Sequence, residues 1–383
     1  MYTVLACGSN GNYQLGLDNN DDQSQLRPSV FSSQSEFSST RADAGTETRI
    51  EAKPKKIACG GNHTLILLEN GKVFSCGSNE YGQTGHPVEE EAFIATFRAV
   101  PDPPDGAKWI AIACAWECSF FIDDYNRLYS CGNGAKGELG LGTSTRCQRT
   151  IAQVRELGAD IVKIHSSMSH VVVQTSSGKL FGWGSCKKGQ LGVMDKQSVT
   201  RGAVWEPVEL NFEAGVDSAQ VDDFQTGRDF TVVLATERSQ GPNRLTIWGK
   251  STVDVEKANR EIEQGAGHGG LAAMWSSVHW KSLKRGIISF GTDTHGQLFD
   301  YALPHPERAH KLDFTVGSEH GLLLSMNKVY AWGWGEHGNC GEPSLKNTDG
   351  ITYNYLNPIY EGPQEVVLIA GGCATSWVVI KAD

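Results

Sequence analysis

The sequence of 383 residues predicts an all-β fold, a seven-bladed β-propeller that forms a single domain over residues 1–383. Three observations lead to this fold class. A glycine-rich phrase recurs every few dozen residues, an apolar hairpin precedes most copies, and the last hairpin lacks its return strand at the C-terminus. Repeats of this length are typical of arrays in which each unit buries its apolar face against its neighbours.

The recurring phrase has the form W/C-G-x-N-x-x-G-Q-L-G, with substitutions. Its glycines indicate a tight turn, because glycine adopts positive φ without steric cost. The copies are Cys7–Gly16, Cys76–Gly85, Cys131–Gly140, Trp183–Gly192, Phe290–Phe299 and Trp332–Gly341. The second residue of each copy is a glycine, and we take each such glycine as the landmark of one sheet. Gly249 is the landmark of a unit that lacks the rest of the phrase. These landmark glycines are Gly8, Gly77, Gly132, Gly184, Gly249, Gly291 and Gly333.

An apolar hairpin comes before each landmark. The clearest one runs from Ile57 to Leu68, turns at Asn70-Gly71 and returns through Val73–Gly77. Asn-Gly between apolar runs is a strong hairpin signal, because both residues tolerate positive φ. The corresponding outward and return segments are 112–121 with 128–132, 164–173 with 180–184, 221–234 with 245–249, 274–280 with 287–291, and 314–324 with 329–333.

The seventh unit is divided between the two ends of the chain. Residues 369–380 form its first half, and the missing return strand matches residues 3–8. We therefore expect the N-terminal strand to complete the C-terminal blade, which closes the ring and removes its free edge.

Uneven spacing of the landmarks locates the insertions. Residues 17–53 are rich in Ser, Asp and Asn and predict a flexible loop, and residues 86–108 predict another loop. Residues 253–264 follow Gly249 in place of the usual phrase and predict a short helix.

Bulk composition excludes several classes of function. The net charge of -10 disfavours direct nucleic-acid binding, which relies on clustered Lys and Arg. No apolar run is long enough to cross a bilayer, and no signal peptide opens the chain, so we expect no membrane association. The 10 cysteines share repeat positions with tryptophans, which favours buried reduced thiols and a reducing, cytoplasmic or nuclear location.

Motifs for chemistry are missing from the sequence. It has no phosphate-binding G-x-x-x-x-G-K-S/T loop, no H-E-x-x-H and no compact Cys/His spacing beyond Cys114 and Cys118. We therefore expect no enzymatic activity, no catalytic residues, no cofactor and no metal site.

Taken together, the turn phrase and a G-x-x-H-T/S strand resemble the regulator-of-chromosome-condensation repeat family over nearly the whole chain. Within that family, residues 274–280, 317–321, 332–341 and 371–377 are similar to a fungal branch. The resemblance implies a heterodimer with a small CSL-type zinc protein, which supplies electrons for diphthamide formation on elongation factor 2. It also implies support of the Elongator complex, which modifies wobble uridines in tRNA. The propeller would then be a regulatory scaffold.

The similarity to this branch is concentrated from Met274 onward, so we place the partner-binding site on the loops of units five to seven. Aromatic side chains at loop ends bury much area at little entropic cost and are favoured as interface anchors. The candidate residues are Trp275, His279, Trp280, His295, Glu319, His320, Trp334, Glu336 and His337. Ordinary turn chemistry for the Glu-His-Gly triplets and inter-blade packing for the tryptophans are the alternatives.

The histidine position of the G-x-x-H strand has a separate structural interpretation. We assign it to His63, Cys118, His170, Phe230, His279, His320 and Ala374. Replacement by Phe and Ala argues against a catalytic or metal ring. A hydrogen bond to the adjacent blade explains the histidines better, because buried polar groups find partners.

Two other functions remain open. The founding member of the family is a guanine-nucleotide exchange factor for a Ran-like small GTPase, but the predicted N-terminal strand and the acidic charge disfavour this role here. An adaptor for tubulin or for a ubiquitin ligase is the other alternative.

Overall fold

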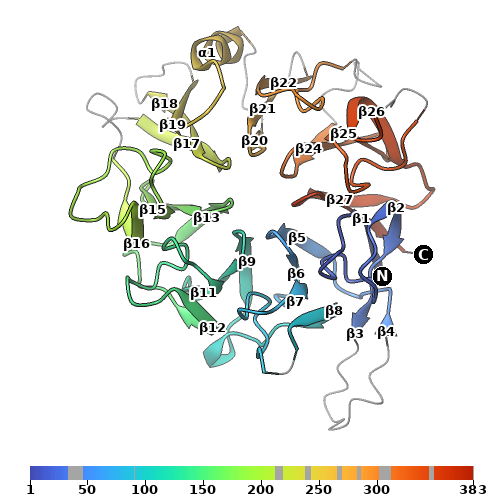
Figure 1. The fold of residues 1–383 in the computed structure, drawn as a ribbon, viewed down its shortest axis with the longest axis horizontal. Coiled ribbons are helices and arrows are strands. Elements are labelled where there is room, and N and C mark those ends of the chain that lie inside the picture. The colour runs from blue at the N-terminus through green and yellow to red at the C-terminus, as the bar shows by residue number, and fades with distance from the viewer. Residues whose placement is uncertain are drawn as a thin grey trace.

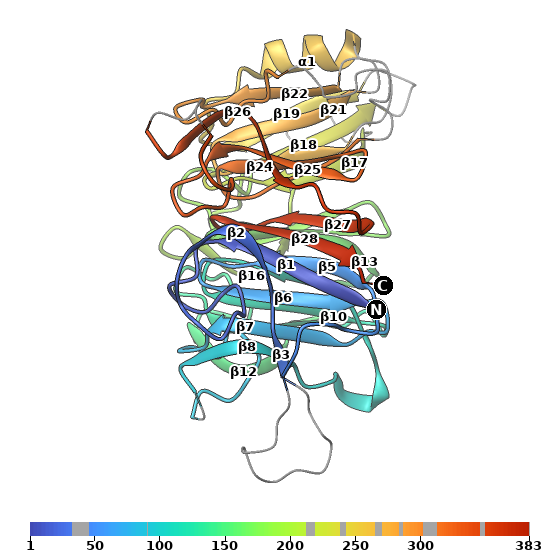
Figure 2. The same cartoon turned by 90° about the vertical axis from the view of Figure 1, so that its right-hand side faces the viewer.

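The structure, a computed structural model, describes residues 1–32, 46–89, 91–211, 219–237, 243–264, 270–282, 286–301, 312–344 and 349–382. Seven sheets surround a central axis, and the two chain ends lie side by side (Figure 1). Seen edge-on, the strands of the sheets run across the thickness of a disc (Figure 2). The predicted seven-bladed propeller is confirmed.

Each blade is built on antiparallel strands, the first of which lies nearest the axis, and the one parallel pairing among the described strands is that of the added strand β3 with β8 in blade I. We number the blades I to VII in the chain order of these first strands. Blade I contains β5 (Pro54–Cys59), β6 (His63–Leu68), β7 (Val73–Ser78) and β8 (Phe93–Ala99), extended by β3 (Phe31–Ser32) and β4 (Thr46–Glu47). Blade II contains β9 (Trp109–Cys114), β10 (Cys118–Asp123), β11 (Leu128–Asn133) and β12 (Cys147–Gln153). Blade III contains β13 (Ile161–Ser166), β14 (His170–Thr175), β15 (Leu180–Ser185) and β16 (Ala203–Glu209).

Blades IV and V have three strands each within the described chain. Blade IV contains β17 (Ala219–Thr226), β18 (Phe230–Glu237) and β19 (Asn243–Gly249), and blade V contains β20 (Leu271–Ala273), β21 (Ser277–Ser282) and β22 (Gly286–Gly291). Blade VI contains β23 (Asp313–Val316), β24 (His320–Ser325), β25 (Lys328–Trp334) and β26 (Thr352–Tyr360).

Blade VII joins the two ends of the chain, as predicted. Its strand order is β2 (Gln23–Pro28), β1 (Tyr2–Gly8), β28 (Thr375–Lys381) and β27 (Val366–Gly371). Strands β1 and β28 pair without a break from Tyr2↔Lys381 to Gly8↔Thr375. This ladder replaces a free edge with backbone hydrogen bonds between the termini.

Two predicted loops contain strands, which corrects the sequence interpretation. Within residues 17–53, β2 is the outer strand of blade VII, and the buried Phe31 of β3 stacks on Phe97 with ring centres 5.0 Å apart. Residues 33–45 of this predicted loop lie outside the described residues. Within residues 86–108, β8 is the fourth strand of blade I, and β3 and β4 lie outside it. Outer strands have few buried side chains, so the apolar pattern that predicts a strand is weak in them.

The predicted helix is confirmed as α1 (Val255–Gln264), which lies beside β19 at the outer edge of blade IV (Figure 1). Its buried side chains are Ala258 and Ile262. The Asn259 side chain accepts from the Leu245 amide at 2.7 Å and donates to the Leu245 carbonyl at 3.0 Å. The helix therefore covers part of a strand edge that a fourth strand covers in blades I, II, III, VI and VII. No helix in the described ranges is long and apolar enough to cross a membrane.

The landmark glycines lie where the third strand passes the loop between the first two strands. Gly77 has a φ of +102°, and a Cβ on it would come within 2.4 Å of the Asn62 carbonyl oxygen. A larger residue would combine backbone strain with a steric clash, which explains why glycine recurs here.

A hydrogen-bonded relay connects blade I to blade II. Ser119 Oγ donates to the Gln83 carbonyl at 2.6 Å and lies 2.8 Å from His63 Nε2. Because the serine proton is directed at Gln83, the imidazole donates through Nε2, and its buried Nδ1 has no partner. The same arrangement links His170, Thr231 and Gln190, and links His320, Ser376 and Asn339. The predicted inter-blade role of these histidines is confirmed.

Register corrects two members of the histidine position. His63 pairs with landmark Gly77, and the residues that pair with Gly291 and Gly8 are Ser277 and Thr375. The position in blades V and VII therefore belongs to these hydroxyl residues, and not to His279 and Ala374. The loop before β21 contains Met274 where the loops of blades I, IV, VI and VII have glycine. The motif alone therefore did not set the register.

Loss of one relay hydroxyl is expected to destabilise the propeller. Ser119→Ala leaves the His63 N–H and the Gln83 carbonyl without a partner in a buried site, which costs about 2 kcal/mol. Urea unfolding measures the change. Ser144→Ala, at an exposed loop position, is the matched control and should change the unfolding free energy little. Equal midpoints for the two variants would contradict the relay.

Acidic pH is expected to weaken the fold through the same histidines. Burial lowers the pKa of His63 and of His170 to about 3 and that of His320 to about 4, from an ordinary value of 6.5. The unfolded chain binds protons more readily, so this stability is complete above pH 6.5 and is lost progressively as the pH falls toward the folded pKa. At pH 5 each histidine lowers the unfolding free energy by about 2 kcal/mol. Urea unfolding of His63→Gln should show a loss between pH 7 and pH 5 that is smaller by this amount, and an identical loss would refute the assignment.

Candidate functional site

One face of the disc carries both the glycine-rich turns and the loops that join the first and second strands of each blade. We call it the loop face. The inner loops of blades IV to VII are joined by main-chain hydrogen bonds from Arg228 to Trp275 (3.1 Å), Trp275 to Ser318 (2.8 Å) and Ser318 to Gly372 (2.9 Å). Successive amides donating around the ring hold these loops in a rigid belt, so side chains on them are positioned before any partner arrives.

Two predicted site residues meet on the loop face between blades V and VI. The rings of His295 and Trp334 stack in parallel, with centres 4.4 Å apart and planes 10° apart, and both are partly exposed. His295 is held by its amide, which donates to Gln297 Oε1 at 2.7 Å, and Trp334 by its amide, which donates to the Glu319 carbonyl at 2.9 Å. The stacked pair is an amphipathic platform with little rotamer freedom to lose on binding.

The Glu319 carboxylate lies between the same two blades. Its Oε2 accepts from Ser276 Oγ at 2.7 Å and from Gln297 Nε2 at 3.4 Å. Burial raises the pKa of this carboxyl, while these two donors and the charge of Arg228 partly oppose the shift. Its main role is to hold the loops of blades V and VI together.

Glu336 and His337 occupy the tip of the blade VI turn, and both are exposed. His337 Nδ1 lies 2.8 Å from Asp22 Oδ2, and Asp22 Oδ1 accepts from the Asn10 amide at 2.7 Å. This contact joins the turn of blade VI to that of blade VII. An exposed pair of this kind adds little stability, but it orients both turns.

Trp275 lies at the mouth of the axial cavity, opposite a residue that sequence analysis did not single out. Its ring centre is 5.9 Å from that of Trp116, which belongs to the inner loop of blade II. Trp116 packs over Gly61, where a Cβ would come within 2.8 Å of the indole. Trp116 and Trp275 occupy equivalent positions in their repeats. This equivalence could have identified Trp116 from the sequence once Trp275 had been singled out.

Three predicted contact residues lie in the interior, which corrects their assignment. His279 and His320 have no exposed surface, and Trp280 is 1% exposed. His279 bonds to Ser289 and Ser277 within its own blade, and His320 belongs to the relay described above. Strand alternation directs these side chains between blades, so no partner can reach them on the folded disc.

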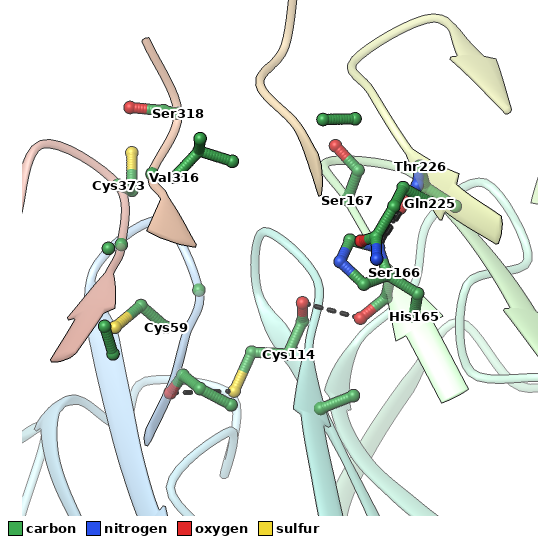
Figure 3. Close-up of a pocket in the computed structure, with 18 of the residues that line it drawn as sticks. Cys59, Cys114, His165, Ser166, Ser167, Gln225, Thr226, Val316, Ser318 and Cys373 are labelled. Carbon is green, nitrogen blue, oxygen red and sulfur yellow. Dashed lines mark hydrogen bonds between the residues drawn. The ribbon is translucent and has the colours of Figure 1, made fainter. Parts of the chain in front are cut away.

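The axial cavity has a volume of about 340 Å³ and is lined by the first strands of all the blades. Figure 3 shows Cys59 and Cys373 on one side and His165, Gln225 and Thr226 on the other. Burial raises the pKa of Cys59 to about 11 and that of Cys373 to about 12, so both thiols stay protonated and weakly nucleophilic. Among the described residues, no group of three His, Cys, Asp or Glu side chains is placed to hold a metal ion.

Comparison with known proteins identifies relatives over the whole length of the chain. The family described as RCC1-like domain matches residues 3–378. An RCC1 repeat-containing protein of Schizosaccharomyces pombe is 27% identical over 392 residues, covering 99% of both chains. A mouse secretion-regulating guanine nucleotide exchange factor is 24% identical and covers 99% of this chain and 83% of its own. The crystal structure of Prp20p from Saccharomyces cerevisiae superposes with a TM-score of 0.73 at 19% identity, covering 100% of this chain and 92% of that one.

Proposed function

The chain belongs to the RCC1-like domain family, and we propose that it is a non-enzymatic binding platform whose loop face on blades V to VII holds a small protein. The observation that carries the proposal is the stacked pair of His295 and Trp334, partly exposed on loops that main-chain hydrogen bonds hold rigid. Aromatic anchors on a preorganised surface are the features that give protein interfaces their affinity.

We infer the identity of the partner from sequence resemblance to the fungal α-tubulin-suppressor branch of the family. The partner is then a small CSL-type zinc protein that carries electrons, bound as a heterodimer. Through this complex the propeller would support diphthamide formation and Elongator-dependent modification of wobble uridines in tRNA, in the cytoplasm or nucleus. Trp275, His295, Trp334, Glu336 and His337 remain as contact residues, with Glu319 positioning the loops beneath them.

Truncation of the stacked pair tests the site. Trp334→Ala should weaken binding of the zinc protein at least tenfold, because central aromatic anchors contribute about 2 kcal/mol or more. Isothermal titration calorimetry measures the dissociation constant, and His337→Ala should give a smaller loss.

Tyr125→Ala provides a matched control. Tyr125 is 62% exposed and lies in the turn between the second and third strands of blade II, on the opposite face of the disc. Its removal should leave binding unchanged. Undiminished affinity in both Trp334→Ala and His337→Ala would remove these loops from the interface, and thermal unfolding of each variant would show that the disc is intact.

A second candidate function is guanine-nucleotide exchange, because the mouse relative with that activity in its name aligns with 99% of this chain. Release of labelled GDP from a Ran-like GTPase distinguishes the two. A scaffold should leave the release rate unchanged at micromolar concentration, whereas a marked acceleration would favour the exchange factor.

A further inference from the structure

A small pocket with a strongly cationic rim lies between blades II and III on the loop face. Its volume is about 200 Å³, and Lys136, Arg146, Lys187 and Arg201 line it together with Trp205. It lies away from the blades V to VII surface, so it is independent of the function proposed above.

The four cationic side chains come from turns and loops of blades II and III. Lys136 is at the tip of the blade II turn, and Arg146 precedes β12, with its guanidinium 5.7 Å from the centre of the Trp205 ring. Lys187 belongs to the blade III turn, and its stem lies across Gly202, where a Cβ would be 2.5 Å from Lys187 Cγ. Glycine at 202 therefore allows the lysine to lie along the wall of the pocket.

Arg201 is held in an unusual backbone conformation. It forms a two-residue hairpin with Gly202, and the flanking Thr200 and Ala203 exchange amide-to-carbonyl hydrogen bonds of 2.9 and 3.1 Å. Its φ of 56° is left-handed, a region that Gly, Asn and Asp occupy more easily than arginine. An arginine in a strained position at the rim of a pocket indicates a use for its guanidinium.

No ion pair in the described structure neutralises these charges. Burial raises the pKa of the nearby Glu138 carboxyl, and the Lys136 charge partly opposes that shift. No carboxylate lines the pocket, and none of the four cations forms an ion pair with a described residue. Two carboxyls lie on the same elements but are not among the residues that line the pocket. Glu138 Oε2 accepts from the Lys136 amide at 2.7 Å, and Glu206 Oε1 lies beside Gly142. Four converging cations in a chain of net charge -10 create a local positive field that favours a compact anion.

We propose that this pocket binds a phosphate monoester. A dianion with three acceptor oxygens can engage two guanidinium groups and two ammonium groups at once. An RNA backbone fits the observations less well. The cations surround one hollow and do not form a stripe, and Trp205 is only 7% exposed, so it has no free face for stacking a base. The phosphate is either free or carried on a phosphorylated side chain of a partner.

Calorimetric titration of the full chain tests the proposal with inorganic phosphate, a short phosphoserine peptide and the same peptide without phosphate. We expect saturable binding of one phosphate per chain and no binding of the unphosphorylated peptide. Tighter binding of the phosphopeptide than of phosphate would identify a partner protein as the source, and equal binding would identify a free ligand.

Adjacent lysines supply the matched control. Lys187 lines the pocket and Lys188 does not, although both are exposed and carry the same charge. Lys187→Gln should weaken phosphate binding about tenfold through loss of a charge-assisted hydrogen bond, and Lys188→Gln less than about twofold. Arg201→Gly should also weaken binding while leaving the melting temperature equal or higher, because glycine relieves the strained φ.

Equal losses in Lys187→Gln and Lys188→Gln would overturn the proposal, because they would show a diffuse charge effect. A second result would also overturn it: a single-stranded oligonucleotide without a terminal phosphate binds more tightly than inorganic phosphate and the phosphopeptide, and Lys187→Gln and Lys188→Gln weaken that binding equally. That result would assign the cations to a polyanion surface.

Discussion

The ring depends on one interaction, a hydrogen bond to a turn carbonyl of the preceding blade, which six of the seven blades, all but blade V, form within the described chain. A hydroxyl or an indole N–H reaches the main-chain oxygen at one repeat position, occupied by Gln14, Gln83, Glu138, Gln190, Gln297 and Asn339. Because the acceptor is main chain, the donor can be Ser, Thr or Trp and the repeats can diverge while the geometry persists. Only the conformation of the turn must be conserved for the acceptor carbonyl to stay in place, and the glycines of the turn permit that conformation. Blade IV lacks the glycine-rich phrase, and there a helix lies beside the third strand instead.

The hydrogen bonds that make the disc rigid do not use the side chains exposed on its surface. Main-chain bonds hold the loops, so their side chains are free to serve binding. On the loop face, blades V to VII present the stacked rings of His295 and Trp334, while blades II and III present the cations around Trp205. The two surfaces differ in chemistry and lie on different blades of one stiff body.

Several features could be predicted from the sequence because they obey short-range rules. Asn70-Gly71 predicts its hairpin, and the split seventh unit predicts the ladder of β1 with β28. Other features could not. Strand β2 has one aliphatic side chain, Leu26, and no buried residue, so no apolar alternation reveals it. His279, Trp280 and His320 carry the residue types of an interface, but strand register directs them inward, and a one-dimensional pattern does not report burial.

The sequence by itself determined the number of blades, the closure through the two termini and the inter-blade role of His63, His170 and His320. The first two follow from turn chemistry and strand pairing, and the third from the need of buried polar groups for partners. Only the tertiary structure decided which side chains share a surface. Trp116 and Trp275 meet over the axis from blades II and V, and Arg146 and Arg201 reach one pocket from neighbouring blades. The spacing of such residues depends on how the blades wedge together around the axis, which no local sequence pattern specifies.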